Sequence, residues 1–165
     1  GVRSDRQPPV PAVWPVVATR VGLDLNPIDV RDPNAALWLR ALVWPDELGR
    51  ADLLQQAVQV AKRDPPMMLA GDALERLPEV LAAIPQDHAV CVFHTHTTNQ
   101  VSPEARAQLS ALLAEHAGGG DLYRVSIEWL SETHPRLELI SYEDGVKTEH
   151  VLAYCGSHGE WLKWL

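Results

Sequence analysis

Two histidines, His94 and His96, follow directly on an apolar, β-branched run over residues 89–93. A short apolar run of this kind, preceded by the turn residues 85–87, predicts a strand that is buried on both faces. Because side chains alternate along a strand, the two imidazoles are expected on one side, with Thr95 on the other. Imidazole titrates near neutral pH and also binds divalent metals, so this pair suits a catalytic base or a metal ligand.

Two carboxylates stand in matching places, each at the end of another strand-like stretch. Asn26 lies two residues after Asp24, Ala73 directly follows Asp72, and all four are candidates for binding a cofactor. Ligands of open α/β sheets bind beyond the carboxyl ends of the strands. Asp24 is therefore placed to accept hydrogen bonds from a ribose diol, and Asp72 to accept one from the exocyclic amine of a base. The structural alternative is that Asp24 only caps a turn and Asp72 only caps the following helix.

Metal-dependent hydrolysis, using His94 and His96 with Asp24 or Asp72, is an alternative function. A catalytic zinc site needs three protein ligands. Four other histidines are scattered, and they fit surface loops or termini: His116, His134, His150 and His158. The sequence therefore assigns no metal site, and a pair of pocket-lip or loop-capping histidines also remains open.

The elements that position these residues predict an α/β fold. Strands are expected at about 18–25, 67–70, 88–94, 122–130, 137–142 and 148–155. Helices are expected from Asp32 to Trp44, from Asp46 to Arg63, over about 78–84, and from Ser102 to Gly118. We expect the first three strands to be parallel neighbours, and Asp144-Gly145 to turn a closing hairpin. This order indicates a Rossmann-like three-layer sandwich, with a mostly parallel sheet that ends in an antiparallel hairpin.

Composition narrows the possible partners. The chain has 165 residues and a formal net charge of −8, so it lacks the basic surface that attracts nucleic acid or an anionic membrane. No apolar run is long enough to span a bilayer. The two cysteines, Cys91 and Cys155, suggest no disulfide framework, which makes a reducing cytoplasm the expected compartment. A small-molecule ligand remains the expected partner.

The proline-rich beginning of the chain predicts an extended arm or linker over residues 1–17. Residues 18–165 are then expected to form one α/β domain, which is part of a longer architecture. The tryptophans are expected to pack in the core, and Cys91 to be an inert buried thiol.

The order of these motifs resembles the later half of class I S-adenosylmethionine-dependent methyltransferases. More closely, residues 16–165 resemble a bacterial family called domain of unknown function 2332, most specifically in the stretch 38–45. The methyltransferase resemblance implies that Asp24 binds the ribose of S-adenosylmethionine, that Asp72 lies on the adenine side, and that His94 faces the methyl acceptor.

The same resemblance implies that part of the fold is missing from this chain. The first strand and the glycine-rich loop of methyltransferases have no counterpart, and Gly118-Gly119-Gly120 follows a helix instead. We therefore expect either an N-terminal half or a second copy of the chain to complete the sheet. A non-catalytic binding or assembly module, which keeps the fold without the chemistry, is the third functional hypothesis.

Overall fold

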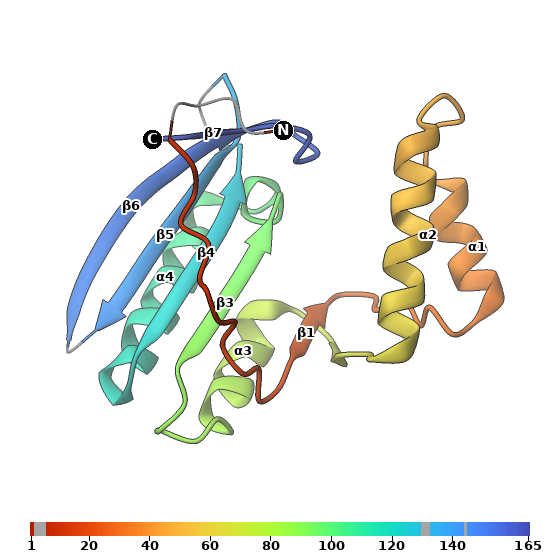
Figure 1. Ribbon diagram of the computed structural model, residues 1–165. Helices are drawn as coiled ribbons and strands as arrows, with labels where there is room; N and C mark the ends of the chain where they lie inside the picture. Colours follow the sequence, from red (N-terminus) through yellow and green to blue (C-terminus); the bar gives the residue numbers. More distant parts are fainter. Residues whose placement is uncertain (2–5, 130–132, 144) are drawn as a thin grey trace. The chain divides into compact units, whose positions relative to one another are not determined.

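The computed structural model describes residues 1, 6–129, 133–143 and 145–165 (Figure 1). It divides into two compact units, which are described in turn. The smaller unit spans Pro15–Leu77, and the larger unit combines Gly1–Trp14 with Pro78–Leu165. Within the described ranges, no helix is long and apolar enough to cross a membrane.

The smaller unit is built on one pair of parallel strands. Its elements are, in chain order, β1 (Val21–Asp24), α1 (Pro33–Ala41), α2 (Leu48–Arg63) and β2 (Met67–Ala70). The strands pair from Val21 against Met67 to Asp24 against Ala70. Parallel strands need a long crossover between them, and α1 and α2 lie in that crossover. The expected pairing of the first two strands is therefore confirmed.

Local sequence signals set the two helices of this unit. Asp32 caps α1, because its Oδ1 accepts a hydrogen bond from the backbone N–H of Asn34 at 2.9 Å. Pro33 occupies the first helical position, where its missing N–H costs nothing. The second helix begins slightly later than predicted, at Leu48 rather than at Asp46.

The larger unit contains a five-stranded sheet with helices on one side. Its strands are β3 (Val90–Thr95), β4 (Leu122–Glu128), β5 (Arg136–Glu143), β6 (Val146–Cys155) and β7 (Leu162–Trp164). Its helices are α4 (Pro103–His116), the 3₁₀ turns η1 (Thr98–Gln100) and η2 (Ala117–Gly119), and the later part of α3 (Ala73–Ala82), which begins in the smaller unit.

The sheet of the larger unit is mixed rather than mostly parallel. Its order is β3-β4-β5-β6-β7, in which β3 and β4 are parallel and the three later pairings are antiparallel. Residues 129–135 are too few for a parallel crossover, so the chain returns antiparallel after β4. Gly145 turns β5 into β6 with a φ of 74°, which favours glycine. Asp144 of the predicted turn, and Leu130 of the predicted strand, lie outside the described residues.

The predicted row of three parallel strands needs a correction. β1 pairs with β2, but β3 takes β4 as its hydrogen-bonded neighbour, so the described strands form two separate sheets. The mixed α/β character is confirmed. A Rossmann-like three-layer arrangement stays a prediction.

Helix α3 begins earlier than the predicted span of about 78–84. Its start is explained by Asp72, whose Oδ1 accepts a hydrogen bond from the backbone N–H of Leu74 at 2.7 Å. Pro78, which the sequence suggests as the first residue of the helix, lies inside it instead. The cap at Asp72 therefore decides where this helix begins.

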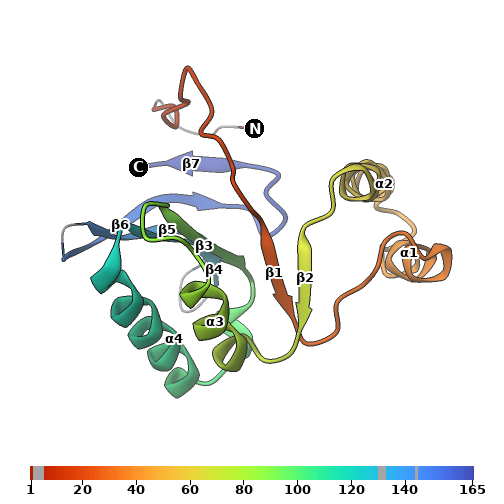
Figure 2. The same ribbon diagram turned by 90° about the horizontal axis from the view of Figure 1, so that it is seen from below.

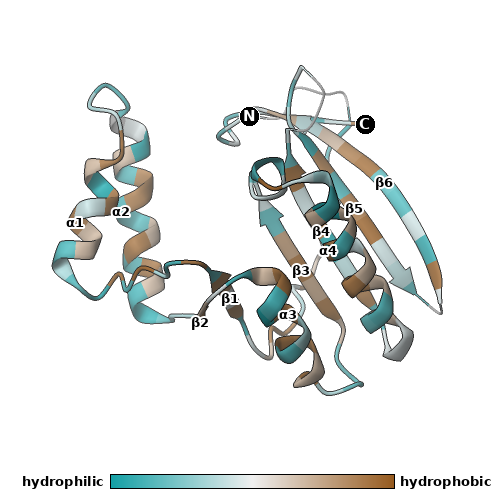
Figure 3. Ribbon diagram, turned by 180° about the vertical axis from the view of Figure 1, so that it is seen from behind, coloured by the Kyte–Doolittle hydropathy of each residue, from teal (hydrophilic) through white to brown (hydrophobic). Residues whose placement is uncertain are grey.

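Only one face of β3 is buried, which corrects the prediction of a strand buried on both faces. Val90 is buried, whereas Phe93 is 77% exposed and Cys91 is exposed as well. Figure 2 shows α3 and α4 on the same side of the sheet, and the core lies there, with Leu113 of α4 and Leu122 of β4 fully buried. Figure 3 shows that β3 is nevertheless hydrophobic along most of its length.

Candidate functional site

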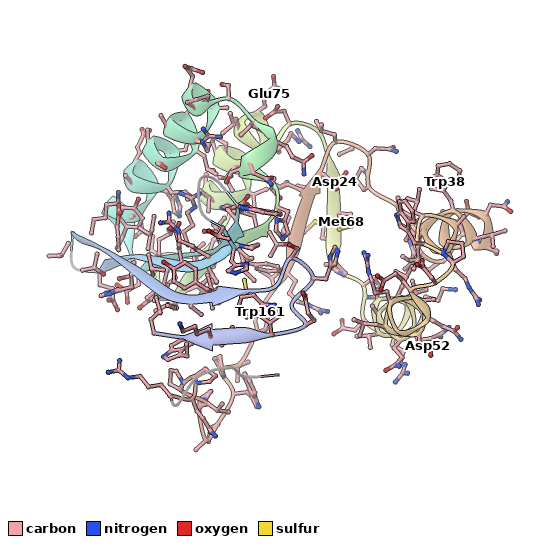
Figure 4. The ribbon with its side chains drawn as sticks, turned by 90° about the horizontal axis from the view of Figure 1, so that it is seen from above. Asp24, Trp38, Asp52, Met68, Glu75 and Trp161 are labelled. Atoms are coloured by element: carbon pink, nitrogen blue, oxygen red, sulfur yellow. The ribbon has the colours of Figure 1, made fainter. Side chains whose placement is uncertain are left out.

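The smaller unit brings Asp24 and Asp72 to the same end of its two parallel strands. Asp24 is the last residue of β1 and pairs with Ala70, the last residue of β2. The backbone N–H of Gly71 donates to the carbonyl oxygen of Asp24 at 3.0 Å, and Asp72 follows directly. Figure 4 labels Asp24 on β1, beside the strand that carries Met68. The two acids therefore lie at adjacent carboxyl ends of strands.

Both carboxylates already make one local hydrogen bond. Asp24 Oδ1 accepts from the backbone N–H of Asn26 at 2.8 Å, and Asp72 Oδ1 accepts from that of Leu74 at 2.7 Å. These are the turn and cap roles that were the structural alternative. Among the described residues no hydrogen bond is made to either Oδ2, and Asp24, Asn26, Asp72 and Ala73 are all exposed. Each carboxylate therefore keeps an oxygen for a ligand.

The turn from β2 into α3 depends on glycine. Gly71 has a φ of 136°, a conformation that side chains with a Cβ rarely adopt. A Cβ at this position would also come within 3.0 Å of Cγ of Arg76. Gly71 thereby allows the chain to turn sharply, so that Asp72 stays at the strand end and caps the helix.

In the larger unit, His94 lies in a chain of part-buried polar groups. Its Nδ1 lies 2.7 Å from Glu128 Oε1, and its Nε2 accepts a hydrogen bond from Arg124 Nε at 3.0 Å. Arg124 Nη1 in turn lies 3.4 Å from Ser110 Oγ on α4. A carboxylate accepts and a guanidinium only donates, so the ring must be the neutral tautomer that carries its hydrogen on Nδ1.

Glu128 anchors the loop that follows β3. Its carboxylate accepts hydrogen bonds from three consecutive backbone N–H groups, those of Thr97 at 3.0 Å, Thr98 at 3.1 Å and Asn99 at 3.1 Å. Only 3% of its side chain is exposed. Burial raises the pKa of Glu128, but the N–H groups and His94 outweigh it, so that the pKa falls below its ordinary value.

The environment of His94 favours the neutral ring. Burial lowers the pKa of His94 most, the hydrogen bond with Glu128 opposes this, and the positive charge of Arg124 lowers the pKa further. Both ring nitrogens are engaged, so His94 would act as a base only if Arg124 moved away. Its catalytic role stays a prediction.

His96 does not continue the alternation of β3. The strand ends at Thr95, and His96 has a φ of 51°, in the left-handed region. Its Nε2 lies 3.0 Å from the carbonyl oxygen of Ser157, and its own carbonyl oxygen accepts from the side-chain amide of Gln100. The two imidazoles therefore bind different partners, which corrects the expectation that they face one side as a pair.

Sequence reasoning missed the partners of His94. Arg124, Ser126 and Glu128 alternate along β4 and therefore share one face, and Ser126 pairs with His94 in the sheet. Polar residues at every second position of a strand with apolar neighbours are the signal that points to such a buried network. Ser110 gives no comparable signal within its helix.

Neither of two hollows in the surface is lined by the predicted site residues. One, of about 450 Å³, lies at the amino ends of β1 and β2 beside Arg20 and Asp64. The other, of about 270 Å³, is lined by the chain before β3 and the end of α4, including His88 and His116. Among the described residues, no group of three or more His, Cys, Asp or Glu side chains is arranged to hold a metal ion. The hydrolase alternative therefore gains no geometric support.

Comparison with known proteins places the chain in a family. A family model described as an uncharacterized protein conserved in bacteria, DUF2332, matches residues 1–164. The chain belongs to DUF2332. The match covers both units, so Asp24, Asp72 and the His94 network all lie within the DUF2332 region. No curated protein and no solved structure matches the chain.

Proposed function

We propose that this DUF2332 chain binds a nucleoside-containing ligand of the S-adenosylmethionine type at the carboxyl ends of β1 and β2. The single observation that supports the proposal is the parallel pairing that brings Asp24 and Asp72 to one edge. Ligands of α/β proteins bind at this edge, because loops and helix starts surround it.

The two acids suit different parts of such a ligand. Asp24 Oδ2 would accept hydrogen bonds from a ribose diol, while its Oδ1 stays bonded to the backbone of Asn26. Asp72 Oδ2 would accept from an exocyclic amine, while its Oδ1 keeps capping α3. These residues fit the nucleoside half of S-adenosylmethionine, and when bound that cofactor would supply an activated methyl group.

We expect weak binding by this chain alone. Asp24 and Asp72 are exposed, and their hydrogen bonds with a ligand must compete with water, which leaves each bond a small net gain. The expected dissociation constant is about 1 mM, equivalent to about −4 kcal/mol. Such affinity is measured better by NMR than by calorimetry.

The test is a titration of ¹⁵N-labelled chain with S-adenosylmethionine and, separately, with adenosine. We expect saturable shifts in the amide signals of residues 24–26 and 72–74 with both ligands. Asp24→Ala should weaken binding at least threefold. Asp52→Ala removes an exposed acid on α2 of the same unit (Figure 4) and should leave binding unchanged.

The proposal is wrong if these amides do not shift at 10 mM ligand, on the order of ten times the expected dissociation constant. Equal affinities of Asp24→Ala and Asp52→Ala for S-adenosylmethionine would also contradict the proposal.

A second candidate is an assembly module that pairs with another copy of itself. The observation that favours it is the exposed apolar surface, because α1 buries no residue and Phe93 projects from β3. Figure 3 shows hydrophobic segments along α1 and α2. Large exposed apolar areas commonly mark interaction surfaces.

A further inference from the structure

Arg124 connects three elements of the larger unit through its guanidinium group. It originates on β4, donates from Nε to His94 of β3 at 3.0 Å, and reaches Ser110 of α4 with Nη1 at 3.4 Å. Ser110 Oγ in turn donates to the carbonyl oxygen of Arg106 within the same helix at 3.1 Å. The position of Arg124 therefore depends on a lone pair that His94 offers at Nε2.

That lone pair exists only while His94 is neutral. Protonation puts a hydrogen on Nε2, which then faces the N–H of Arg124 at hydrogen-bond distance, donor against donor. It also puts two positive charges side by side in a part-buried site. One proton therefore converts an attraction into a repulsion at this contact.

We propose that the hydrogen bond between His94 and Arg124 is a pH-dependent switch. The neutral ring holds the guanidinium against α4, and protonation of the ring releases it. At the other ring nitrogen, Nδ1, protonation strengthens the hydrogen bond instead of breaking it. The Nδ1–H bond to the Glu128 carboxylate then joins two opposite charges, which strengthens it. Acid thus frees Arg124 while the loop held by Glu128 stays in place.

The charged groups around the ring come from every element beside it. Arg124 and Glu128 lie on β4, and Glu138 on β5 sits in the same row as His94 and adds a weak negative field. Arg136 forms an ion pair with Glu138 at 2.8 Å, which moderates that field. Arg106 of α4 donates to the carbonyl oxygens of Thr98 and Val101.

These groups have opposite effects on the protonation of His94. The carboxylates of Glu128 and Glu138 favour the protonated ring, whereas burial and Arg124 favour the neutral one and prevail. The pKa of His94 is lowered from 6.5, so the neutral ring holds Arg124 at neutral pH and releases it as the pH falls through that lowered pKa.

The experiment follows the ring and the guanidinium by NMR between pH 8 and pH 4.5. At pH 7.5, long-range ¹H–¹⁵N spectra should show His94 with its hydrogen on Nδ1, and the Nε–H of Arg124 should exchange slowly. As the pH falls toward the His94 pKa, the protection of Arg124 Nε–H should drop by up to about tenfold per pH unit, after correction for intrinsic exchange. The backbone N–H groups of Thr97–Asn99 should keep their protection.

Two variants separate this switch from general acid sensitivity. His94→Gln cannot take up a proton, and it should remove the pH dependence of Arg124 exchange. His88→Gln removes a more exposed histidine that pairs with Asp87, and it should behave like the unmodified chain.

Three results would each overturn the proposal. They are a ring with its hydrogen on Nε2 at pH 7.5, an Arg124 Nε–H whose protection is independent of pH, and a parallel loss of protection in Thr97–Asn99. All three are measured on the unmodified chain, so the proposal can be tested even if a variant fails to fold.

Discussion

Glu128 is the residue whose removal should cost the larger unit most among those described here. Its buried carboxylate satisfies three backbone N–H groups and the imidazole of His94. Glu128→Gln turns one acceptor into a donor that faces these N–H groups. We expect a loss of about 2–3 kcal/mol in the free energy of unfolding, because buried donors lose a charged partner. Urea denaturation at pH 7.5 measures the loss.

The matched control is Glu143→Gln, which alters a solvent-exposed carboxylate that accepts from the hydroxyl of Tyr123. It should change stability little, because exposed partners regain water. The lowered pKa of Glu128 also predicts the pH dependence of this effect. The contribution of Glu128 to the free energy of unfolding is complete above pH 4.5 and declines as the pH falls through the lower folded-state pKa. Equal losses for the two variants would contradict the role of Glu128.

At the scale of single residues, the sequence predicted the candidate site residues better than it predicted their hydrogen-bond partners. His94, Asp24 and Asp72 stand out because each ends an apolar stretch. Glu128 lies far along the chain from His94, and only the pairing of β3 with β4 brings them together. Sequence spacing carries no information about such a contact until the order of the strands is known.

At the scale of elements, the cap of α4 is a direct test of how the sequence sets a boundary. Ser102 Oγ accepts a hydrogen bond from the backbone N–H of Ala105 at 3.2 Å, as the predicted cap should. Ser102→Ala should cost about 1 kcal/mol, because one N–H of the first turn loses its partner. The shift of the urea midpoint at unchanged slope measures it.

Ser102→Asp is the matched variant, because a carboxylate also caps and favours the positive end of the helix dipole. It should retain the stability of the unmodified chain or exceed it. If alanine and aspartate at position 102 were equally destabilising, the hydrogen bond to Ala105 would not be what fixes this end of α4.

Two helix starts marked by caps were predicted well, whereas the start of α3 at Asp72 and the faces of strands were not. The starts of α1 and α4 follow Asp32 and Ser102 as expected. The prediction that β3 is buried on both faces failed, because an apolar run has the same sequence whether a second layer covers it or not. Phe93 belongs to that run and is 77% exposed.

For the whole molecule, the exposed surface of β3 makes the assembly hypothesis testable. Within the described sheet β3 has a neighbour on one side only, and it carries neither charge nor proline, the usual protections of an edge strand. We expect a dimer by light scattering at concentrations of tens of micromolar, and Phe93→Lys should shift it to monomer. Val146→Lys alters an exposed apolar position on β6 and should leave the dimer unchanged.

A chain that is monomeric at every concentration would contradict self-assembly without affecting the nucleoside proposal.

For the whole molecule, the order of the strands is what the sequence could not predict. The resemblance that suggested a mostly parallel sheet applies to elements in sequence order, whereas the antiparallel return after β4 depends on the short connection of residues 129–135.

The two cysteines differ in a way that has a practical consequence. Cys91 is accessible on the uncovered side of β3, while Cys155 is buried against the carbonyl oxygen of Pro135. A maleimide dye would therefore attach at a single position without any engineered substitution. Partial burial raises the pKa of the Cys91 thiol, so the coupling proceeds best in mildly alkaline buffer. The wild-type chain thus carries its own attachment point for a fluorescent reporter next to Phe93.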